Sequence, residues 1–202
     1  MNITKSVTGL CVFSAFTLSS AQGARAQDDV FDFTGPSLGV EAGIVEHHYY
    51  IEESFPQSDQ ADGKYYRSFG PGGGVFLGYD IPIGANLILG GEASLVIGGA
   101  DNSADFADGS FVRAKPRYGY RIVGRIGRKM TDRSLLYATF GYGSHKYRIT
   151  AAGVDNVKAT GHSFVVGAGG EYRLSKAIGV RLDFRHLDNQ SNQLLIGLPV
   201  RF

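Results

Sequence analysis

Apolar and polar residues alternate along most of the chain, which is the pattern of β-strands that present two different faces. Between residues 117 and 127, for example, Tyr120 and Ile122 fall on one face and Arg121 falls on the other. The same period of two predicts eight strands, at residues 37–46, 73–81, 87–98, 117–127, 135–145, 162–174, 178–187 and 193–202. Either register is possible for the fifth strand, because Leu135 and Leu136 are adjacent. Each strand has one apolar face and one face of small or charged residues, so the sequence predicts an all-β, antiparallel protein.

The connections between these strands decide which face looks inward. A soluble, lipocalin-like barrel shows the same alternation with its apolar face inside. Here long connections at residues 47–72, 99–116 and 146–161 take turns with short ones at 82–86, 128–134 and 175–177. Long extracellular loops and short periplasmic turns alternate in this way in transmembrane barrels. We therefore expect the apolar face to point outward, into a membrane.

Aromatic residues gather near the ends of the predicted strands, as in the two interfacial girdles of membrane barrels. Near the outer rim we expect Tyr49, Tyr50, Tyr65, Tyr66, Phe69, Tyr118, Tyr142 and Tyr147, and near the inner rim Tyr79, Tyr172 and Phe202. The 29 glycines lie inside the periodic segments as well as in turns. Glycine normally weakens a strand, so its frequency favours a tightly curved barrel or a crowded interior.

The amino-terminal residues have the pattern of a cleavable export signal. Lys5 gives a short positive region, residues 7–18 are mostly apolar, and Ala24-Arg25-Ala26 fits a cleavage site of small residues. We therefore divide the chain into a signal peptide at residues 1–26 and a barrel domain at residues 27–202. Cys11, the only cysteine, lies in the signal peptide, so the mature chain has neither a disulfide nor a thiolate metal site.

Charge and hydropathy narrow the classes of function. The chain carries 20 lysines and arginines against 19 aspartates and glutamates. Such a near-neutral balance gives no electrostatic reason to expect nucleic acid as a partner. Beyond the signal peptide no apolar run approaches ~18 residues, so any membrane span must be made of strands.

Three stretches carry a resemblance to a known family. They are Gly35-Pro36-Ser37-Leu38-Gly39-Val40-Glu41-Ala42-Gly43, then Gly73-Gly74-Val75-Phe76-Leu77-Gly78-Tyr79 followed by Gly91-Glu92-Ala93, and the ending Pro199-Val200-Arg201-Phe202. With them the whole mature chain resembles the eight-stranded porin-family or opacity-type outer membrane proteins, relatives of the OmpA transmembrane domain. The resemblance implies an eight-stranded antiparallel transmembrane β-barrel in the cell outer membrane. It also implies insertion by the barrel assembly machinery, for which Phe202 would be the recognition signal.

The polar face of the strands predicts a charged lumen. Its members are Glu41, Glu92, Arg121, Arg125, Glu171, Arg173, Arg181, Asp183, Arg185 and Arg201. An eight-stranded barrel is just wide enough to be filled by its own side chains, and an unpaired buried charge costs several kcal/mol. These charges must therefore pair, and a turn centred on Lys176 would place Glu171 directly across from Arg181. A structural plug of salt bridges is the favoured interpretation, and a narrow pore lined by charges is the alternative.

Two groups of residues near the outer rim are candidates for ligand contact. His47-His48-Tyr49-Tyr50 could ligate a metal or haem, but adjacent histidines followed by Glu52-Glu53 are more often solvated surface, so we expect no metal and no cofactor. Seven bases would lie near the phosphates of lipopolysaccharide: Lys64, Arg67, Arg113, Lys115, Arg117, Lys146 and Arg148. Outer membrane lipids and lipopolysaccharide are therefore expected partners.

An enzyme is the second class of hypothesis. His186-Leu187-Asp188-Asn189 resembles the His-x-Ser-Asn stretch of outer membrane lipid A deacylases, which are also eight-stranded. Asp188 stands where the nucleophilic serine would be, the last strand offers no acid to orient His186, and Ser191 is expected in a loop tip. We therefore favour a non-enzymatic protein that serves envelope integrity, surface adhesion or contact with host or environmental ligands through its long loops, with a small-solute porin as the alternative.

Overall fold

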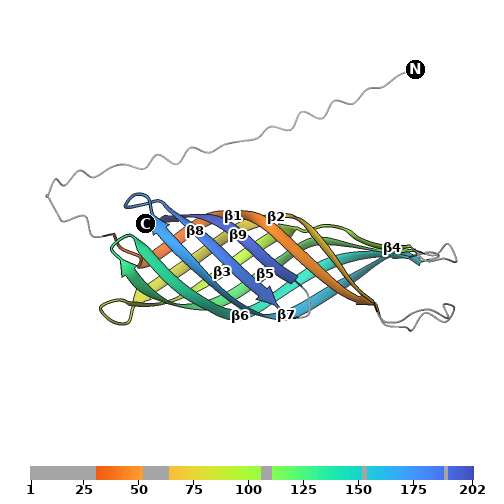
Figure 1. The fold of residues 1–202 in the computed structure, drawn as a ribbon, viewed down its shortest axis with the longest axis horizontal. Helices are drawn as coiled ribbons and strands as arrows, with labels where there is room; N and C mark the ends of the chain where they lie inside the picture. The colour runs from red at the N-terminus through yellow and green to blue at the C-terminus, as the bar shows by residue number, and fades with distance from the viewer. Residues whose placement is uncertain (1–30, 52–63, 106–110, 152–153, 189–190) are drawn as a thin grey trace, which may run out of the picture.

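A computed structural model describes residues 31–51, 64–105, 111–151, 154–188 and 191–202 as a closed antiparallel β-barrel (Figure 1). The predicted signal peptide lies outside the described residues. The strands are β1 (Gly35–Ile51), β2 (Lys64–Pro82), β3 (Leu87–Gly98), β4 (Asn102–Asp105), β5 (Phe111–Thr131), β6 (Ser134–Ala151), β7 (Val154–Arg173), β8 (Gly179–Leu187) and β9 (Ser191–Arg201). No helix among the described residues is long and apolar enough to cross a membrane.

Hydrogen bonding between neighbouring strands closes the sheet on itself. The order is β3-β2-β1-β9-β8-β7-β6-β5, and β3 pairs with β5 to complete the ring. The short β4 follows β3 and pairs beside β5 as well, so the ring has eight positions and the predicted eight-stranded barrel is confirmed. The register of the fifth predicted strand is also resolved, since Leu135 is 1% exposed and Leu136 is 54% exposed.

The side chains are distributed opposite to those of a soluble barrel. Leucine, isoleucine, valine and phenylalanine side chains cover the outer wall, and arginines, aspartates and glutamates fill the inside. Water would oppose such a broad exposed apolar surface, so the medium around the wall must be hydrocarbon. The lipocalin-like alternative is therefore wrong, and the outward-facing apolar side is confirmed.

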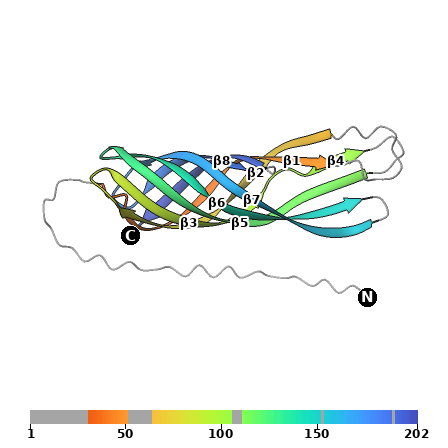
Figure 2. The same ribbon diagram turned by 90° about the horizontal axis from the view of Figure 1, so that it is seen from below.

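The barrel has two different ends. At one end, which we call the turn end, residues 83–86, 132–133 and 174–178 connect the strands. At the other end, which we call the hairpin end, two groups of paired strands extend beyond the closed ring (Figure 2). One group is β1 with β2, and the other is β4, β5, β6 and β7. On β7 and β8 the outward residues change from apolar to polar towards this end, from Phe164 to His162 and from Phe184 to His186. This change marks where the apolar band stops.

The hairpin end corrects the predicted long connections. Residues 47–51, 64–72, 111–116, 146–151 and 154–161 were expected in loops but belong to strands. The backbone ladder continues there because the two strands of each hairpin still pair with each other. Beyond the apolar band the polarity of the two faces is reversed on β5 and β6, where Lys115 and Arg148 are exposed outside while Ala114 and Tyr147 are buried inside. The pattern of a membrane-facing strand therefore does not extend into these segments.

The aromatic residues follow the predicted girdles with one exception. Phe69, Tyr118 and Tyr142 are exposed towards the hairpin end, and Tyr79, Tyr172 and Phe202 are exposed towards the turn end. Tyr147 was expected at the outer rim but is 8% exposed and faces inward, with its ring centroid 5.1 Å from that of His145. The side chains of Tyr49, Tyr50, Tyr65 and Tyr66 lie outside the described residues.

Candidate functional site

All ten charged residues that the sequence assigned to the lumen point into it, because side chains alternate between the two faces of each strand. Each is at most 5% exposed: Glu41, Glu92, Arg121, Arg125, Glu171, Arg173, Arg181, Asp183, Arg185 and Arg201. Asp80, which the sequence analysis missed, lies among them at 1% exposed. It alternates with the outward Tyr79 on β2, so the period of two could have revealed it. Among the residues that the structure describes, the lumen thus holds six arginines and five carboxylates.

Near the turn end, two arginines and two carboxylates are joined by two-pronged pairs, and Arg173 Nη1 also lies 3.8 Å from Glu171 Oε1. Arg125 donates from Nε to Asp80 Oδ1 at 2.6 Å and from Nη2 to Asp80 Oδ2. Arg201 donates from Nη1 to Asp80 Oδ2 at 2.7 Å, and from Nε and Nη2 to the two oxygens of Glu171 at 3.2 and 3.0 Å. Two-pronged contacts of this kind are the strongest geometry for arginine and carboxylate.

Towards the middle of the barrel, Arg181 joins three carboxylates. It contacts Glu92 through Nη1, Glu41 through Nη2 at 2.9 Å, and Asp183 through Nε at 2.8 Å. Its guanidinium carbon also lies 3.6 Å from the centroid of the Phe76 ring. The predicted register is confirmed, because Glu171 is the backbone neighbour of Arg181. The side chains of Glu171 and Arg181 do not pair with each other, however, since the Glu171 carboxylate accepts hydrogen bonds from Arg201.

Two glycines show how the lumen makes room for these side chains. A Cβ at Gly39 would collide with the Phe76 ring, and one at Gly197 would lie 2.7 Å from Arg181 Nε. Such contacts are closer than van der Waals radii allow. The glycines inside the strands therefore have a packing reason, which is the crowded interior that the composition predicted.

An apolar stopper closes the lumen at the turn end. Phe33 is fully buried against Ile88, Leu135 and Tyr137, while the Tyr137 hydroxyl donates to Asp183 Oδ1 at 2.8 Å. Next to Phe33, Thr34 donates from its backbone N–H and its hydroxyl to Asp32, at 2.9 and 2.8 Å. Partial burial opposes ionisation of Asp32, but the bonds from Thr34 prevail and lower the pKa of its carboxyl.

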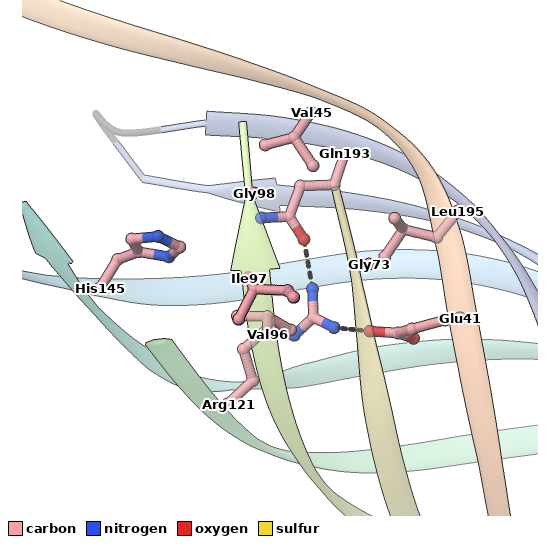
Figure 3. A pocket seen from close by; sticks show the side chains of 10 residues that line it. All are labelled: Glu41, Val45, Gly73, Val96, Ile97, Gly98, Arg121, His145, Gln193 and Leu195. Atoms are coloured by element: carbon pink, nitrogen blue, oxygen red, sulfur yellow. Dashed lines mark hydrogen bonds and ion pairs between the residues drawn. The ribbon is translucent and has the colours of Figure 1, made fainter. Parts of the chain in front are cut away.

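A small cavity of about 10 Å³ lies in the lumen beside Arg121 (Figure 3). Arg121 Nη1 donates to Gln193 and Nη2 donates to Glu41 across its wall, and both contacts are dashed in the figure. A space of this size is on the scale of a single water molecule. It can hold no larger solute.

Of the candidate metal or haem ligands, the structure describes the side chains of His47 and His48, which have different surroundings, whereas those of Tyr49 and Tyr50 lie outside the described residues. His47 was expected in a loop but lies on β1, 1% exposed and directed inward, with its ring centroid 5.4 Å from that of His145. His48 instead lies with Nε2 3.0 Å from Glu46 Oε2. The described residues contain no group of three or more His, Cys, Asp or Glu side chains that could hold a metal ion.

The candidate deacylase residues are separated by the barrel wall. His186 is exposed on the outside, with Nδ1 2.7 Å from Asn192 Oδ1. Ser191 is the first residue of β9 rather than part of a loop tip, and it is 1% exposed on the inner face, where it accepts a bond from Gln193. A base cannot activate a hydroxyl that lies on the other face of the sheet. Asp188 is exposed beyond the end of β8.

The bases of the outer rim lie on the outside of the hairpins. Arg67, Arg113, Lys115, Arg117, Lys146 and Arg148 are exposed, and the side chain of Lys64 lies outside the described residues. Arg148 on β6 is opposite Lys115 on β5 and Lys158 on β7. Lys158 completes this row and was not in the predicted set.

A wall of apolar side chains around a charged, filled lumen defines a class of protein, the transmembrane β-barrels. A family model described as outer membrane protein beta-barrel domain matches residues 8–202. The chain therefore belongs to this family, and its location is the outer membrane. In such barrels the short turns face the periplasm and the longer connections face the outside.

Several solved outer membrane barrels are similar in fold. Ail, the attachment invasion locus protein of Yersinia pestis, crystallised with the heparin analogue sucrose octasulfate, is 12% identical, with a TM-score of 0.49 over 83% of this chain and 99% of that one. Neisserial surface protein A is 14% identical, with a TM-score of 0.46 over the same shares of the two chains. The barrel domain of Pseudomonas aeruginosa OprF is 11% identical, with a TM-score of 0.43 over 84% and 99%. No curated protein matches the chain.

Proposed function

We propose that this chain is a non-enzymatic surface protein whose barrel is a closed scaffold and whose hairpin end makes contacts outside the cell. By this proposal it contributes to envelope integrity and to adhesion or host contact, after removal of residues 1–26 as a signal peptide. The observation that carries the proposal is the combination of a filled lumen with strands that continue beyond the apolar band. The filled lumen opposes transport, and the extended strands provide a surface for contact.

The packing of the lumen argues against the alternative of a small-solute porin. Between the stopper around Phe33 and the cavity beside Arg121, the two-pronged pairs of Arg125 and Arg201 and the contacts of Arg181 cross the interior. A solute would have to break several buried ion pairs to pass, and each break costs ~3–5 kcal/mol. Such a barrier supports a closed scaffold.

The hairpin end offers an open sheet edge for an extended partner. β7 pairs with β8 only from Val165 onward, and β4 pairs with β5 alone among the barrel strands. Phe164 O accepts a bond from the backbone of Asp188 on the β8 side of β7. Backbone groups two residues apart point to the same side of a strand, so those of Thr160 and Lys158 point to the side of β7 where no described strand pairs with them. Unpaired edges of this kind accept added strands.

A proline substitution tests whether this edge is used. Thr160→Pro removes one edge N–H without breaking the ladder to β6, because that N–H points away from β6. Thr160→Ala is the matched control, since it changes the side chain and keeps the N–H. Bacteria that display each form are allowed to settle on cultured epithelial cells and on glass, and attached cells are counted.

We expect Thr160→Pro to lower attachment to the epithelial cells severalfold, and Thr160→Ala to attach like the unchanged protein. The proportion of folded barrel in the membrane is measured alongside, by its shift in gel mobility on heating. Equal attachment by the two substituted forms would show that the edge is not the contact surface. If even the unchanged protein gave no attachment above empty cells, the adhesion proposal would fail as a whole.

A further inference from the structure

Three ring side chains form a cluster inside the hairpin end. The ring centroid of His47 lies 5.4 Å from that of His145 and 5.8 Å from that of Tyr147, and the centroids of the last two are 5.1 Å apart. All three side chains are directed inward and are at most 8% exposed. The cluster lies beyond the apolar band, since His47 is level with Leu187 and His145 is level with Gly161. We call these three residues the ring cluster.

The ring cluster joins the two groups of strands that extend beyond the closed ring. His47 belongs to the group of β1 and β2, whereas His145 and Tyr147 belong to the group of β4 to β7. The ladder between β1 and β9 ends at His47, and the ladder between β2 and β3 ends at Gly72. Further towards the hairpin end, no ladder between described strands connects the two groups. Side-chain contacts such as the ring cluster must therefore hold the groups together.

The surroundings of the ring cluster offer little compensation for a positive charge. Arg121 on β5 lines the same cavity as His145, and Glu41, the carboxylate in that wall, is already bonded to Arg121. The register partners of the two histidines are uncharged: Ser68 and Ser191 for His47, and Gly119 and Gly161 for His145. Protonation of both rings would therefore place three positive groups close together.

Burial keeps both histidines neutral. It lowers the pKa of His47 to about 4, although a bond to the Gly98 backbone opposes the shift and the charge of His48 adds to it. Burial, the charge of His47 and the charge of Arg121 lower the pKa of His145 to about 4. A histidine that is released into water has an ordinary pKa of about 6.5. The open form of the hairpin end therefore binds protons more readily than the closed form.

We propose that the ring cluster is a proton-operated latch between the two groups of extended strands. At neutral pH it holds the groups together, and in acid the charged rings repel each other and Arg121, so that the groups separate and expose their inner faces. Opening becomes more favourable as the pH falls below about 6.5, and the gain levels off near pH 4. This inference goes beyond the proposed function, because the latch opens without a partner.

The test measures how often a cysteine beside the latch becomes accessible in the folded barrel. Cys11→Ala removes the only native cysteine. Ala114→Cys then places a thiol on the inner face of β5, where Ala114 is 7% exposed, and Thr160→Cys places one on an exposed position of β7 as the reference. Both proteins are treated with a water-soluble thiol reagent at about pH 7 and about pH 5, the range in which histidine titrates. The ratio of the two reaction rates cancels the effect of pH on the reagent and on the thiol.

We expect this ratio to rise about twentyfold for each histidine between pH 7 and pH 5, and on the order of several hundredfold for both. His47→Phe with His145→Phe keeps two rings but removes the protons, so the ratio should be the same at both pH values. His186→Phe is the matched control, since it removes an exposed histidine from the outer wall and should keep the full rise. Heat-dependent gel mobility shows which variants fold. If the double variant does not fold, either single substitution replaces it and should keep a rise of about twentyfold.

Two results would overturn the proposal. One is an equal ratio at both pH values in the protein that keeps both histidines, which would show that acid does not open the hairpin end. The other is a full rise in the variant without the two histidines, which would show that other groups drive the opening.

Discussion

The pairing of Glu171 with Arg201, rather than with its backbone neighbour Arg181, gives a prediction that only the side-chain geometry can make. Glu171 is 2% exposed, and both of its oxygens accept bonds from Arg201. Arg181 lies directly across from Glu171 in the register but bonds to carboxylates on other strands. A double-mutant cycle distinguishes the two relationships.

The expected magnitudes follow from the contacts. Removing one partner of a buried ion pair costs ~3–5 kcal/mol. After Glu171→Gln, the Arg201 guanidinium still has Asp80 as an ion-pair partner, at 2.7 Å. We therefore expect a loss of about 3 kcal/mol for Glu171→Gln, at the lower end of that range. The cycle of Glu171→Gln with Arg201→Met should show a coupling of about 1–3 kcal/mol, whereas the cycle with Arg181→Met should be additive within about 0.5 kcal/mol.

The assay is reversible urea unfolding of the barrel in detergent micelles, from which each variant gives a free energy of unfolding. Asp132→Asn, in an exposed turn, is the control and should change that free energy by less than about 0.5 kcal/mol. Coupling of Glu171 to Arg181 as large as that to Arg201 would refute the arrangement of pairs described above.

Three further predictions concern assembly, chemistry and export. Phe202→Ala should lower the outer membrane yield while export across the inner membrane stays intact, and normal levels of folded, heat-modifiable protein would contradict its role as assembly signal. Lipid A mass spectra from cells expressing the protein and from cells expressing His186→Ala should be identical, and a species that lacks one acyl chain only with the unchanged protein would establish a deacylase. The intact mass of the mature protein should correspond to a chain that begins at Gln27, and a mass that includes residues 1–26 would exclude cleavage there.

The sequence predicted the fold well because the period of two reports directly on a wall with one apolar and one polar face. Arg121, Arg181 and Glu92 could be assigned to the lumen for that reason. Their partners could not be predicted, since Arg181 on β8 meets Glu92 on β3 across the barrel. Alternation says which way a side chain points but not what lies opposite across the lumen.

Other features left no periodic trace in the sequence. Phe33 precedes the first strand, so nothing in the alternation identified it as the stopper of the turn end. Lys158 lies in a part of β7 that lacks the pattern of a membrane-facing strand, so that part was assigned to a loop. Both features depend on tertiary arrangement, which local patterns do not encode.

Single-channel recording of the refolded barrel in planar bilayers tests the closed lumen most directly. The unchanged protein should insert and give no discrete conductance steps, because buried ion pairs fill the space between Phe33 and Arg121. Glu92→Ala, which removes a carboxylate shared by Arg181 and Arg185, should raise the frequency of brief openings above that baseline. Stable conductance steps from the unchanged protein would contradict the account and make a porin the leading interpretation.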